Sequence, residues 1–264
     1  METDSAPPRN RVELTSGWDS AAVLVDGRWL ERRPRRPEVA AALLRESRLL
    51  PWLAGRLPIR VPTPTVVQAD PIVVRHELVP GRPISEFTAE QGAALGGFLA
   101  ALHVVDPVEA VAHGLFTRRA TRQQRSGLLL RLTSEVVPLL PTVHRPRAER
   151  LLSVVASLPA DHVVHGDLGP EHVLTTNGVI TGVIDFGDVH LGDPAIDLAW
   201  ALYGTPEHFA RALVAAYHPS QDMVERALVW HQLGPWHEVL HGLDTGDGAL
   251  VDSGIAGVLC RLGS

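Results

Sequence analysis

The sequence contains no lysine, so all 24 residues counted as lysine or arginine are arginines. This absence excludes mechanisms that depend on a lysine side chain: a Walker A phosphate loop, a Schiff base or a lysine general base. Cysteine is nearly absent as well, because Cys260 is the only one. An internal disulfide and a CxxC metal knuckle are therefore excluded.

Long apolar runs are also missing. No run reaches the roughly 18 residues of a membrane-spanning helix, and the first residues, METDSAPPRNR, contain no apolar signal-peptide core. We expect a cytoplasmic protein with no membrane partner. The 30 acidic residues outnumber the 24 basic ones, giving a net charge of −6. A nucleic-acid partner is therefore not expected, and a monomer is the default.

The pattern of the chain changes near residue 80. Before that point, residues 21–32 read as two strands joined by an Asp26-Gly27 turn, and the β-branched residues 72–79 predict another strand. After it, helical patterns dominate, beginning with a capping box formed by Thr88 and Gln91. The order of the elements predicts an α+β fold, with strands first and helices after them.

Two lobes are expected from this division of the 264 residues. A small β-rich lobe spans residues 1–80, and a larger, mainly helical lobe spans residues 84–264. The turn Pro80-Gly81-Arg82-Pro83 suits a linker between them, and the hinge is expected near residues 77–83.

A helix is predicted over residues 38–50, with an apolar stripe through Val39, Leu43 and Leu50. Glu46 falls on the same stripe. A carboxylate on a buried face is costly unless it meets a cation. The pattern therefore predicts a cationic partner for Glu46.

Chemically active side chains are concentrated in residues 165–174 (HGDLGPEHVL) and 182–188 (GVIDFGD). Asn177-Gly178 between them predicts a two-residue hairpin loop, in which residue 172 faces residue 183. His172 and Asp185 then become diagonal neighbours, with backbones about 7–8 Å apart, and a metal can bridge their side chains at that separation. Because Asp167 directly precedes the same strand, two carboxylates and an imidazole are expected to converge.

These motifs resemble the active-site region of the aminoglycoside phosphotransferases, which have a protein-kinase-like fold. The resemblance is specific over residues 162–200 and weaker, but in order, over most of the chain. It implies a bilobal α+β kinase fold and transfer of the γ-phosphoryl group of ATP or GTP to a hydroxyl of a small molecule. By the same resemblance, Asp167 is the catalytic aspartate that orients the attacking hydroxyl and accepts its proton, and Asp185 holds Mg²⁺ on the triphosphate.

Two positions depart from the family pattern. His172 stands where the family often has a metal-binding asparagine. It is either an unusual Mg²⁺ ligand or a structural substitute that leaves water on the metal, and in this respect the chain resembles the macrolide phosphotransferases. Kinases of this fold also pair a strand lysine with a helix glutamate. Arg32 is the matching cation here, Glu46 is its expected partner, and the guanidinium fork of arginine suits phosphate oxygens.

The resemblance supplies further candidates. Residues 16–20 resemble the nucleotide-positioning loop, in which Ser20 approaches phosphates, and the backbone of the hinge at Glu77 and Val79 would bind the purine edge. Asp193 and Asp197 are interpreted as structural, with Asp193 capping a helix that begins at Pro194. The acidic side chains proposed to receive the acceptor are Asp188, Glu238, Asp244 and Asp247.

Other interpretations stay open. Residues 237–241 match the HExxH zinc motif, although no histidine or glutamate follows as a third ligand. The changes at His172 and Arg32 also suit a nucleotide-binding pseudokinase. Among acceptors, the acidic charge mildly favours a cationic aminoglycoside. Macrolides, cyclic peptide antibiotics and metabolites remain alternatives, and ATP and GTP are not distinguished.

Overall fold

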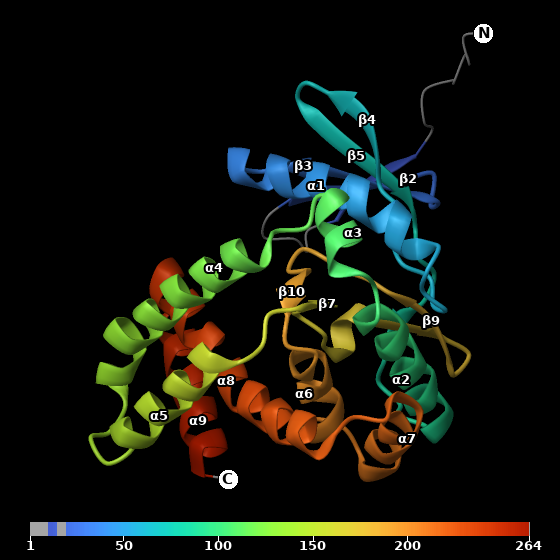
Figure 1. Cartoon of the computed structure of the whole chain (residues 1–264). Coiled ribbons are helices and arrows are strands. Elements are labelled where there is room, and N and C mark those ends of the chain that lie inside the picture. Colours follow the sequence, from blue (N-terminus) through green and yellow to red (C-terminus); the bar gives the residue numbers. More distant parts are fainter. Residues whose placement is uncertain (1–9, 15–19, 264) are drawn as a thin grey trace, which may run out of the picture. The chain divides into compact units, whose positions relative to one another are not determined.

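The computed structural model (Figure 1) describes residues 10–14 and 20–263. Within them the chain divides into two compact units. Unit 1 comprises the chain up to Glu86 together with Val108–Leu115 and Pro170–Asp188. Unit 2 comprises Phe87–Pro107, Phe116–Gly169 and the chain from Val189 onward. The compact units therefore do not follow a single cut in the sequence, and the lobe boundaries given above stay a prediction.

The described part of unit 1 contains an antiparallel sheet of five strands in the order β1-β2-β3-β5-β4. A second antiparallel sheet has the order β6-β8-β9. The strands are β1 (Arg11–Leu14), β2 (Ser20–Val25), β3 (Trp29–Pro34), β4 (Thr65–Ala69), β5 (Ile72–Glu77), β6 (Arg82–Pro83), β8 (Val173–Thr176) and β9 (Val179–Val183). The helices are α1 (Pro37–Ala54), α3 (Pro107–Ala112) and the 3-10 turn η3 (Pro170–His172).

The hairpin turns of unit 1 follow the sequence signals. Asp26 and Gly27 both have positive φ, at 52° and 63°, as do Asn177 and Gly178, at 52° and 78°. Asparagine, aspartate and glycine tolerate this left-handed region better than other residues do. Both pairs therefore reverse the chain between adjacent strands, β2 to β3 and β8 to β9.

The predicted register of the second hairpin is wrong by one residue. Val173, not His172, pairs with Val183, because the ladder shifts between Leu174 and Thr175. The shift is a bulge that leaves Thr181 as an extra residue on β9. Its hydroxyl donates to the carbonyl of Pro80 at 2.5 Å and approaches that of Leu174 at 3.3 Å. These bonds connect the extra residue to residue 80 and to β8, and no local turn signal in the sequence predicts them.

The segment interpreted as a turn and linker, residues 80–83, is also corrected in part. Arg82 and Pro83 form β6, which pairs with Thr175 and Leu174 of β8. Gly81 has a φ of 131°, and a Cβ there would lie 2.6 Å from the Thr181 hydroxyl. The segment is therefore fixed to the second sheet of unit 1.

Helix α1 has the predicted buried face. Val39, Leu43 and Leu50 are buried, and Val39 and Leu43 pack against Val74 of β5. The helix extends beyond residue 50 to Ala54 and contains Pro51. Glu46 is buried on this face, as the stripe predicts.

Unit 2 is mainly helical, with a short antiparallel pair of strands, β7 (His162–Val164) and β10 (His190–Gly192). The predicted Thr88/Gln91 capping box is present at the start of its first helix. Trp236 lies fully buried in a core built from several of the later helices. The helices are α2 (Ala89–His103), α4 (Arg118–Arg131), the π-turn η1 (Leu132–Val136), the 3-10 turn η2 (Val137–Leu139), α5 (Arg145–Ser157), α6 (Ala195–Tyr203), α7 (Glu207–Tyr217), α8 (Gln221–Thr245) and α9 (Gly248–Gly263).

No helix in the described residues combines the length and the apolar character needed to cross a membrane.

Candidate active site

In unit 1, the ion pair expected between Arg32 and Glu46 is present. Arg32 on β3 donates from Nη1 to Oε2 of Glu46 at 2.6 Å, and from Nε to the Ser20 hydroxyl at 3.1 Å. Glu46 is 5% exposed and Ser20 is 6% exposed, whereas about a fifth of the Arg32 side chain is exposed. Arg32 is thus fixed on its inner side and keeps part of its side chain accessible. Residues 16–19, which precede Ser20 in the predicted phosphate loop, lie outside the described residues.

Burial raises the pKa of Glu46, although the charge and hydrogen bond of Arg32 lower it in part. The negative charge of Asp185 adds to the rise. Asp185 is therefore close enough for its charge to act on Glu46 within unit 1. The side chains predicted for phosphate and for metal are electrostatically coupled.

His172 and Asp185 are brought together, despite the wrong register. His172 Nε2 lies 3.6 Å from Asp185 Oδ2, and the Ile184 N–H donates to the His172 carbonyl at 2.9 Å. The Asp185 side chain is 55% exposed and that of His172 is 13% exposed. Asp185 also has a φ of 63°, an uncommon backbone conformation for a non-glycine residue. Both side chains therefore converge, with one carboxylate accessible to a ligand.

The donor set decides which metal this pair suits. Within residues 10–14 and 20–263, no three His, Cys, Asp or Glu side chains gather in a way that could hold a metal ion. A protein-only cage is thus not formed there. Mg²⁺ is typically bound through one or two carboxylates, with substrate phosphates and water as its other ligands. Asp185 with His172 fits that partial shell.

The predicted hinge is fixed by a backbone hydrogen bond to Arg28 and by ion pairs of Glu77 with two arginines. The Leu78 N–H donates to the Arg28 carbonyl at 2.7 Å, and a ring nitrogen of His76 lies 2.9 Å from the Glu77 carbonyl. The Glu77 carboxylate bonds Arg60 and Arg28, which lower its pKa. The side chain of Glu77 is therefore committed to these arginines, and binding of a purine by the backbone here stays a prediction.

The close approach of Val79 explains why residue 182 on β9 is a glycine. A Cβ at Gly182 would lie 2.1 Å from Val79 Cγ1 and 3.2 Å from the Arg60 carbonyl. Only glycine lets β9 approach Val79 so closely. Val79 is thereby buried against the strand that leads to Asp185.

In unit 2, the loop after β7 carries Asp167, which is exposed. Its N–H donates to Nδ1 of the buried His165 at 3.3 Å, and Gly166 between them has a φ of 86°. His165 and Gly166 therefore shape this loop. The loop presents Asp167 on its accessible side.

Asp197 fixes the same loop through hydrogen bonds to its backbone. Its Oδ2 accepts from the His165 N–H at 2.7 Å and its Oδ1 accepts from the Gly166 N–H at 2.8 Å. Burial alone would raise the pKa of Asp197. The hydrogen bond and charge of His103, with smaller contributions from His165 and Gly166, bring that pKa below its ordinary value. Asp197 is thus structural, as interpreted from the sequence.

Two residues of this cluster were missed by the sequence analysis. His103 on α2 lies 3.0 Å from Asp197 Oδ2 through Nε2, and its Nδ1 lies 2.8 Å from the Tyr217 hydroxyl. An ionised carboxylate only accepts hydrogen bonds, so Nε2 of His103 donates to Asp197. The signal was available, since His103 is a polar residue next to the buried Leu99 and Leu102.

Asp193 is fully buried and also structural. Its Oδ1 accepts from the Ala195 N–H at 3.2 Å, but α6 begins at Ala195 with Pro194 as its N-cap residue, so Asp193 lies one position before the predicted cap. Its Oδ2 accepts from Arg226 Nε at 2.9 Å and Trp230 Nε1 at 3.1 Å. The carboxylate therefore joins α6 to α8.

The acidic residues proposed for the acceptor are not equivalent. Asp244 accepts two bonds from Arg131, at 2.6 and 3.2 Å, which hold its pKa below the ordinary value. Glu238 acts electrostatically on Arg261. Asp188 and Asp247 are exposed, and Asp188 belongs to unit 1. An acceptor role for any of these residues stays a prediction, and the charge of Asp244 is already compensated.

The HExxH pattern at residues 237–241 lies on α8. In the described part of the chain, its two histidines find no third side chain with which to hold a metal. The pattern is therefore not a zinc site of the usual three-ligand kind there.

With this geometry in place, comparison with known proteins decides the family. A model of the phosphotransferase enzyme family matches residues 11–230. The chain belongs to this family. Its matched region includes every nucleotide, metal and catalytic candidate above and ends before Glu238 and Asp244.

Relatives of this chain include viomycin phosphotransferase from Streptomyces vinaceus, which is 34% identical over 182 residues. That alignment covers 66% of this chain and 61% of the relative. A second relative, an uncharacterized protein of Bacillus subtilis, is covered over 62% of its length. The chain thus spans about three fifths of the length of the curated relatives it matches.

Two solved structures establish the fold. The GDP complex of aminoglycoside 2'-phosphotransferase-IIIa is 23% identical with a TM-score of 0.80, covering 99% of this chain and 95% of that one. Macrolide 2'-phosphotransferase MphH from Brachybacterium faecium is 25% identical with a TM-score of 0.74, covering 94% and 91%. The predicted α+β, protein-kinase-like fold is confirmed.

Proposed function

We propose that this chain is a small-molecule O-phosphotransferase that moves the γ-phosphoryl group of ATP or GTP to a hydroxyl of an antibiotic. Aminoglycosides are the first acceptors to test. The observation that carries the proposal is the arrangement in unit 1. There Glu46 holds Arg32, and its pKa responds to Asp185, whose carboxylate lies beside His172. Phosphoryl transfer depends on such cations and metal-binding groups for positioning and for charge neutralisation.

The residues of unit 1 receive these roles in the proposal. Arg32, fixed by Glu46 and Ser20, binds phosphate oxygens of the donor with the accessible part of its guanidinium. Asp185 and His172 hold Mg²⁺, which neutralises triphosphate charge when bound. The backbone at Glu77 and Val79 receives the purine.

Asp167 acts on the acceptor. Its carboxylate orients the attacking hydroxyl and accepts its proton as the hydroxyl oxygen bonds to the γ-phosphorus. The bond from phosphorus to the β,γ-bridging oxygen breaks, and the nucleoside diphosphate leaves. His165, Gly166 and Asp197 position Asp167 by fixing the backbone of its loop.

A second acceptor class is favoured by a specific observation. The 34% identity to viomycin phosphotransferase makes viomycin a direct alternative to an aminoglycoside. The fold similarity to a macrolide 2'-phosphotransferase, together with histidine at position 172, brings macrolides into the same panel.

The test is a coupled assay of nucleoside diphosphate release. It uses ATP or GTP with Mg²⁺ and compares aminoglycosides, viomycin and macrolides as acceptors. We expect release that depends on one acceptor class and that Asp167→Ala abolishes. Asp252→Ala, at an exposed position of α9, serves as the matched control and should behave like the wild type.

The outcomes separate the alternatives. Undiminished release by Asp167→Ala would show that the role given to Asp167 is wrong. Nucleotide binding without release across the whole panel would favour a pseudokinase. His172→Ala tests the metal role, with His172→Asn as the conservative comparison: a raised Mg²⁺ requirement in the alanine variant alone would support ligation at this position, and an unchanged requirement in both variants would contradict it.

A further inference from the structure

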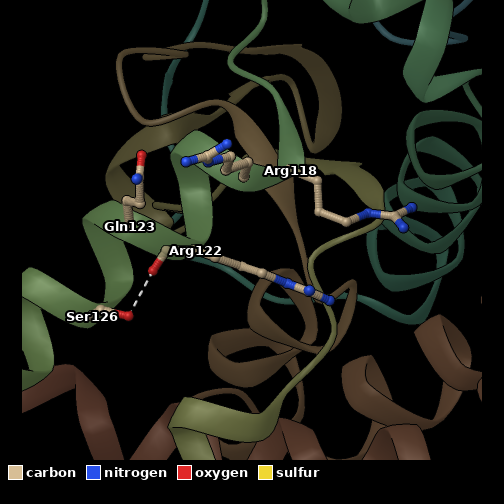
Figure 2. Close-up of a pocket in the computed structure, with 5 residues that line it drawn as sticks. Arg118, Arg122, Gln123 and Ser126 are labelled. Atoms are coloured by element: carbon tan, nitrogen blue, oxygen red, sulfur yellow. Dashed lines mark hydrogen bonds between the residues drawn. The ribbon is translucent and has the colours of Figure 1, made fainter.

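A second candidate site lies on α4 in unit 2. A cavity of about 550 Å³ is lined by Arg118, Arg119, Arg122, Gln123 and Ser126. This volume lies within the usual range for small-molecule pockets. Figure 2 shows Arg118 and Arg122 extending to the same side of the helix, with Gln123 pointing away from them. The cavity wall carries three guanidinium groups and no carboxylate.

The positions of these arginines are unfavourable for the helix itself. Arg118 and Arg122 are spaced i,i+4, and Arg119 and Arg122 are spaced i,i+3, so like charges are neighbours on the helix surface. Arg118 and Arg119 also occupy the first turn, where the helix dipole favours negative side chains. The first turn contains no acidic residue, and Thr117 caps the helix instead. An anion bound here would relieve both repulsions.

Contacts divide the arginines of α4 into two kinds. Arg118 donates to the Ala160 carbonyl at 3.2 Å, and Arg125 donates to the Leu158 and Pro159 carbonyls at 2.6 and 2.9 Å. The side chains of Arg119 and Arg122 make no hydrogen bond or ion pair with the residues that the structure describes. Both are exposed. Two charges at the cavity are thus uncompensated within the described chain.

Other arginines of the protein show the contrast. Arg32 pairs with Glu46, Arg131 with Asp244 and Arg226 with Asp193. At the α4 cavity, by contrast, Arg119 and Arg122 lie together without such a carboxylate partner among the described residues.

We propose that this cavity is an anion-binding site that takes the phosphate or carboxylate group of a small molecule. Guanidinium forks bind both groups through paired N–H donors. Gln123 can add an amide donor. The Ser126 hydroxyl already donates to the Arg122 carbonyl at 2.9 Å and so helps to fix the backbone of the site. Anion binding itself does not depend on the proposed phosphotransferase activity, whereas assigning the anion to the acceptor rests on it.

Two sources of the anion share this chemistry: an acidic group on the acceptor itself, or a free small anion. The bonds from Arg118 and Arg125 tie α4 to residues 158–160, and β7 then leads to the loop of Asp167. Backbone signals of this segment and acceptor kinetics are therefore the two readouts of the experiment.

The experiment titrates the full chain with inorganic phosphate at constant ionic strength, with chloride as the balancing anion, and follows backbone amide NMR signals. The variant is Arg119→Gln with Arg122→Gln. The matched control is Arg150→Gln with Arg211→Gln, two exposed arginines on α5 and α7. We expect saturable shifts centred on α4 in the wild type and the control, and at least tenfold weaker binding in the variant. Absence of saturable shifts in the wild type, or equal binding in the three proteins, would overturn the proposal.

Acceptor kinetics identify the source once phosphate binding is established. Acceptors that carry or lack an acidic group are compared in the wild type and the variant. A higher KM in the variant only for acidic acceptors assigns the site to the acceptor. An unchanged KM for every acceptor, with phosphate binding still lost in the variant, assigns it to a free anion. Unfolding midpoints of all three proteins check that the substitutions leave the fold intact.

Discussion

Glu46 in unit 1 and Asp197 in unit 2 are both buried carboxylates, and the groups that donate hydrogen bonds to them differ. Glu46 in unit 1 receives one charged donor, Arg32, and burial raises its pKa. Asp197 in unit 2 receives His103 and two backbone N–H groups, and its pKa is lowered. Asp197 is the more deeply buried, with 0% exposure against 5% for Glu46.

Burial alone therefore does not set the ionisation of these groups. Three fixed donors stabilise the charged form of Asp197 against a full desolvation cost, because hydrogen bonds to an ionised carboxylate favour that form. One ion pair does not do so for Glu46, whose charge is also opposed by Asp185. The difference suits the roles proposed for them: Asp197 fixes a loop, whereas Glu46 holds a cation that binds a ligand.

The largest effect is expected for Asp197→Asn. The amide keeps one acceptor and introduces an NH2 group against the donors of His165, Gly166 and His103. Breaking a buried charged network typically costs about 3–5 kcal/mol, and we expect a loss in that range by urea unfolding. Asp252→Asn, on the exposed face of α9, is the control. A loss below about 1 kcal/mol, the net value of one ordinary hydrogen bond, would show that the network is not essential to the fold.

Glu46→Gln should cost less stability, about 1 kcal/mol, because the amide still accepts from Arg32, whose charge is partly exposed to solvent. Its main effect is expected on nucleotide binding, since Arg32 loses the charge that holds it. Titration with a fluorescent nucleotide measures the affinity, and Glu13→Gln on β1, an exposed position, is the control. Unchanged affinity would separate the ion pair from the nucleotide site.

The dependence of stability on pH should have opposite signs for the two groups. The stabilisation from Asp197, with its lowered pKa, is present above its ordinary pKa of 3.8 and is lost as the pH falls through the folded value. That from Glu46, with its raised pKa, is complete below 4.5 and is lost as the pH rises through the folded value.

Urea unfolding between acid and neutral pH tests these signs. Asp197→Asn should weaken the loss of stability on the acid side, and Glu46→Gln should weaken the loss above pH 4.5. The same pH profile in a variant and the wild type would contradict the sign assigned to that group.

The sequence predicted the burial and the partner of Glu46, but only the structural role of Asp197 and not its side-chain partners. Glu46 was found because a charge on an apolar stripe needs a partner, and Arg32 was the cation that the family pattern placed nearby. Asp197 was interpreted as structural, but His103 and Tyr217 lie 94 and 20 residues from it in the chain, and no local pattern joins them. The same limit applies to Asp244, whose partner Arg131 is 113 residues away.

Local signals also failed where tertiary contacts intervened. Asn177-Gly178 predicted the turn correctly, but the bulge at Thr181 depends on Pro80, which is 101 residues earlier. The α4 cavity has the charge opposite to the one expected for an acceptor site. The sequence analysis proposed acidic residues for the acceptor, whereas this cavity is lined by arginines. Ordinary surface arginines and unpaired ones look the same in sequence.

The smallest effect is expected for Tyr217→Phe, which removes the outermost hydrogen bond of the Asp197 network. The lost bond to His103 should cost about 1 kcal/mol. The more specific readout is hydrogen exchange at the His165 and Gly166 amides, which should become faster because His103 holds Asp197 less firmly. Tyr203→Phe is the control, since its hydroxyl donates to the Val224 carbonyl in α8 at 3.0 Å. If exchange at the two amides is as slow in Tyr217→Phe as in the control, Tyr217 does not help to position the loop of Asp167, and the network ends at His103.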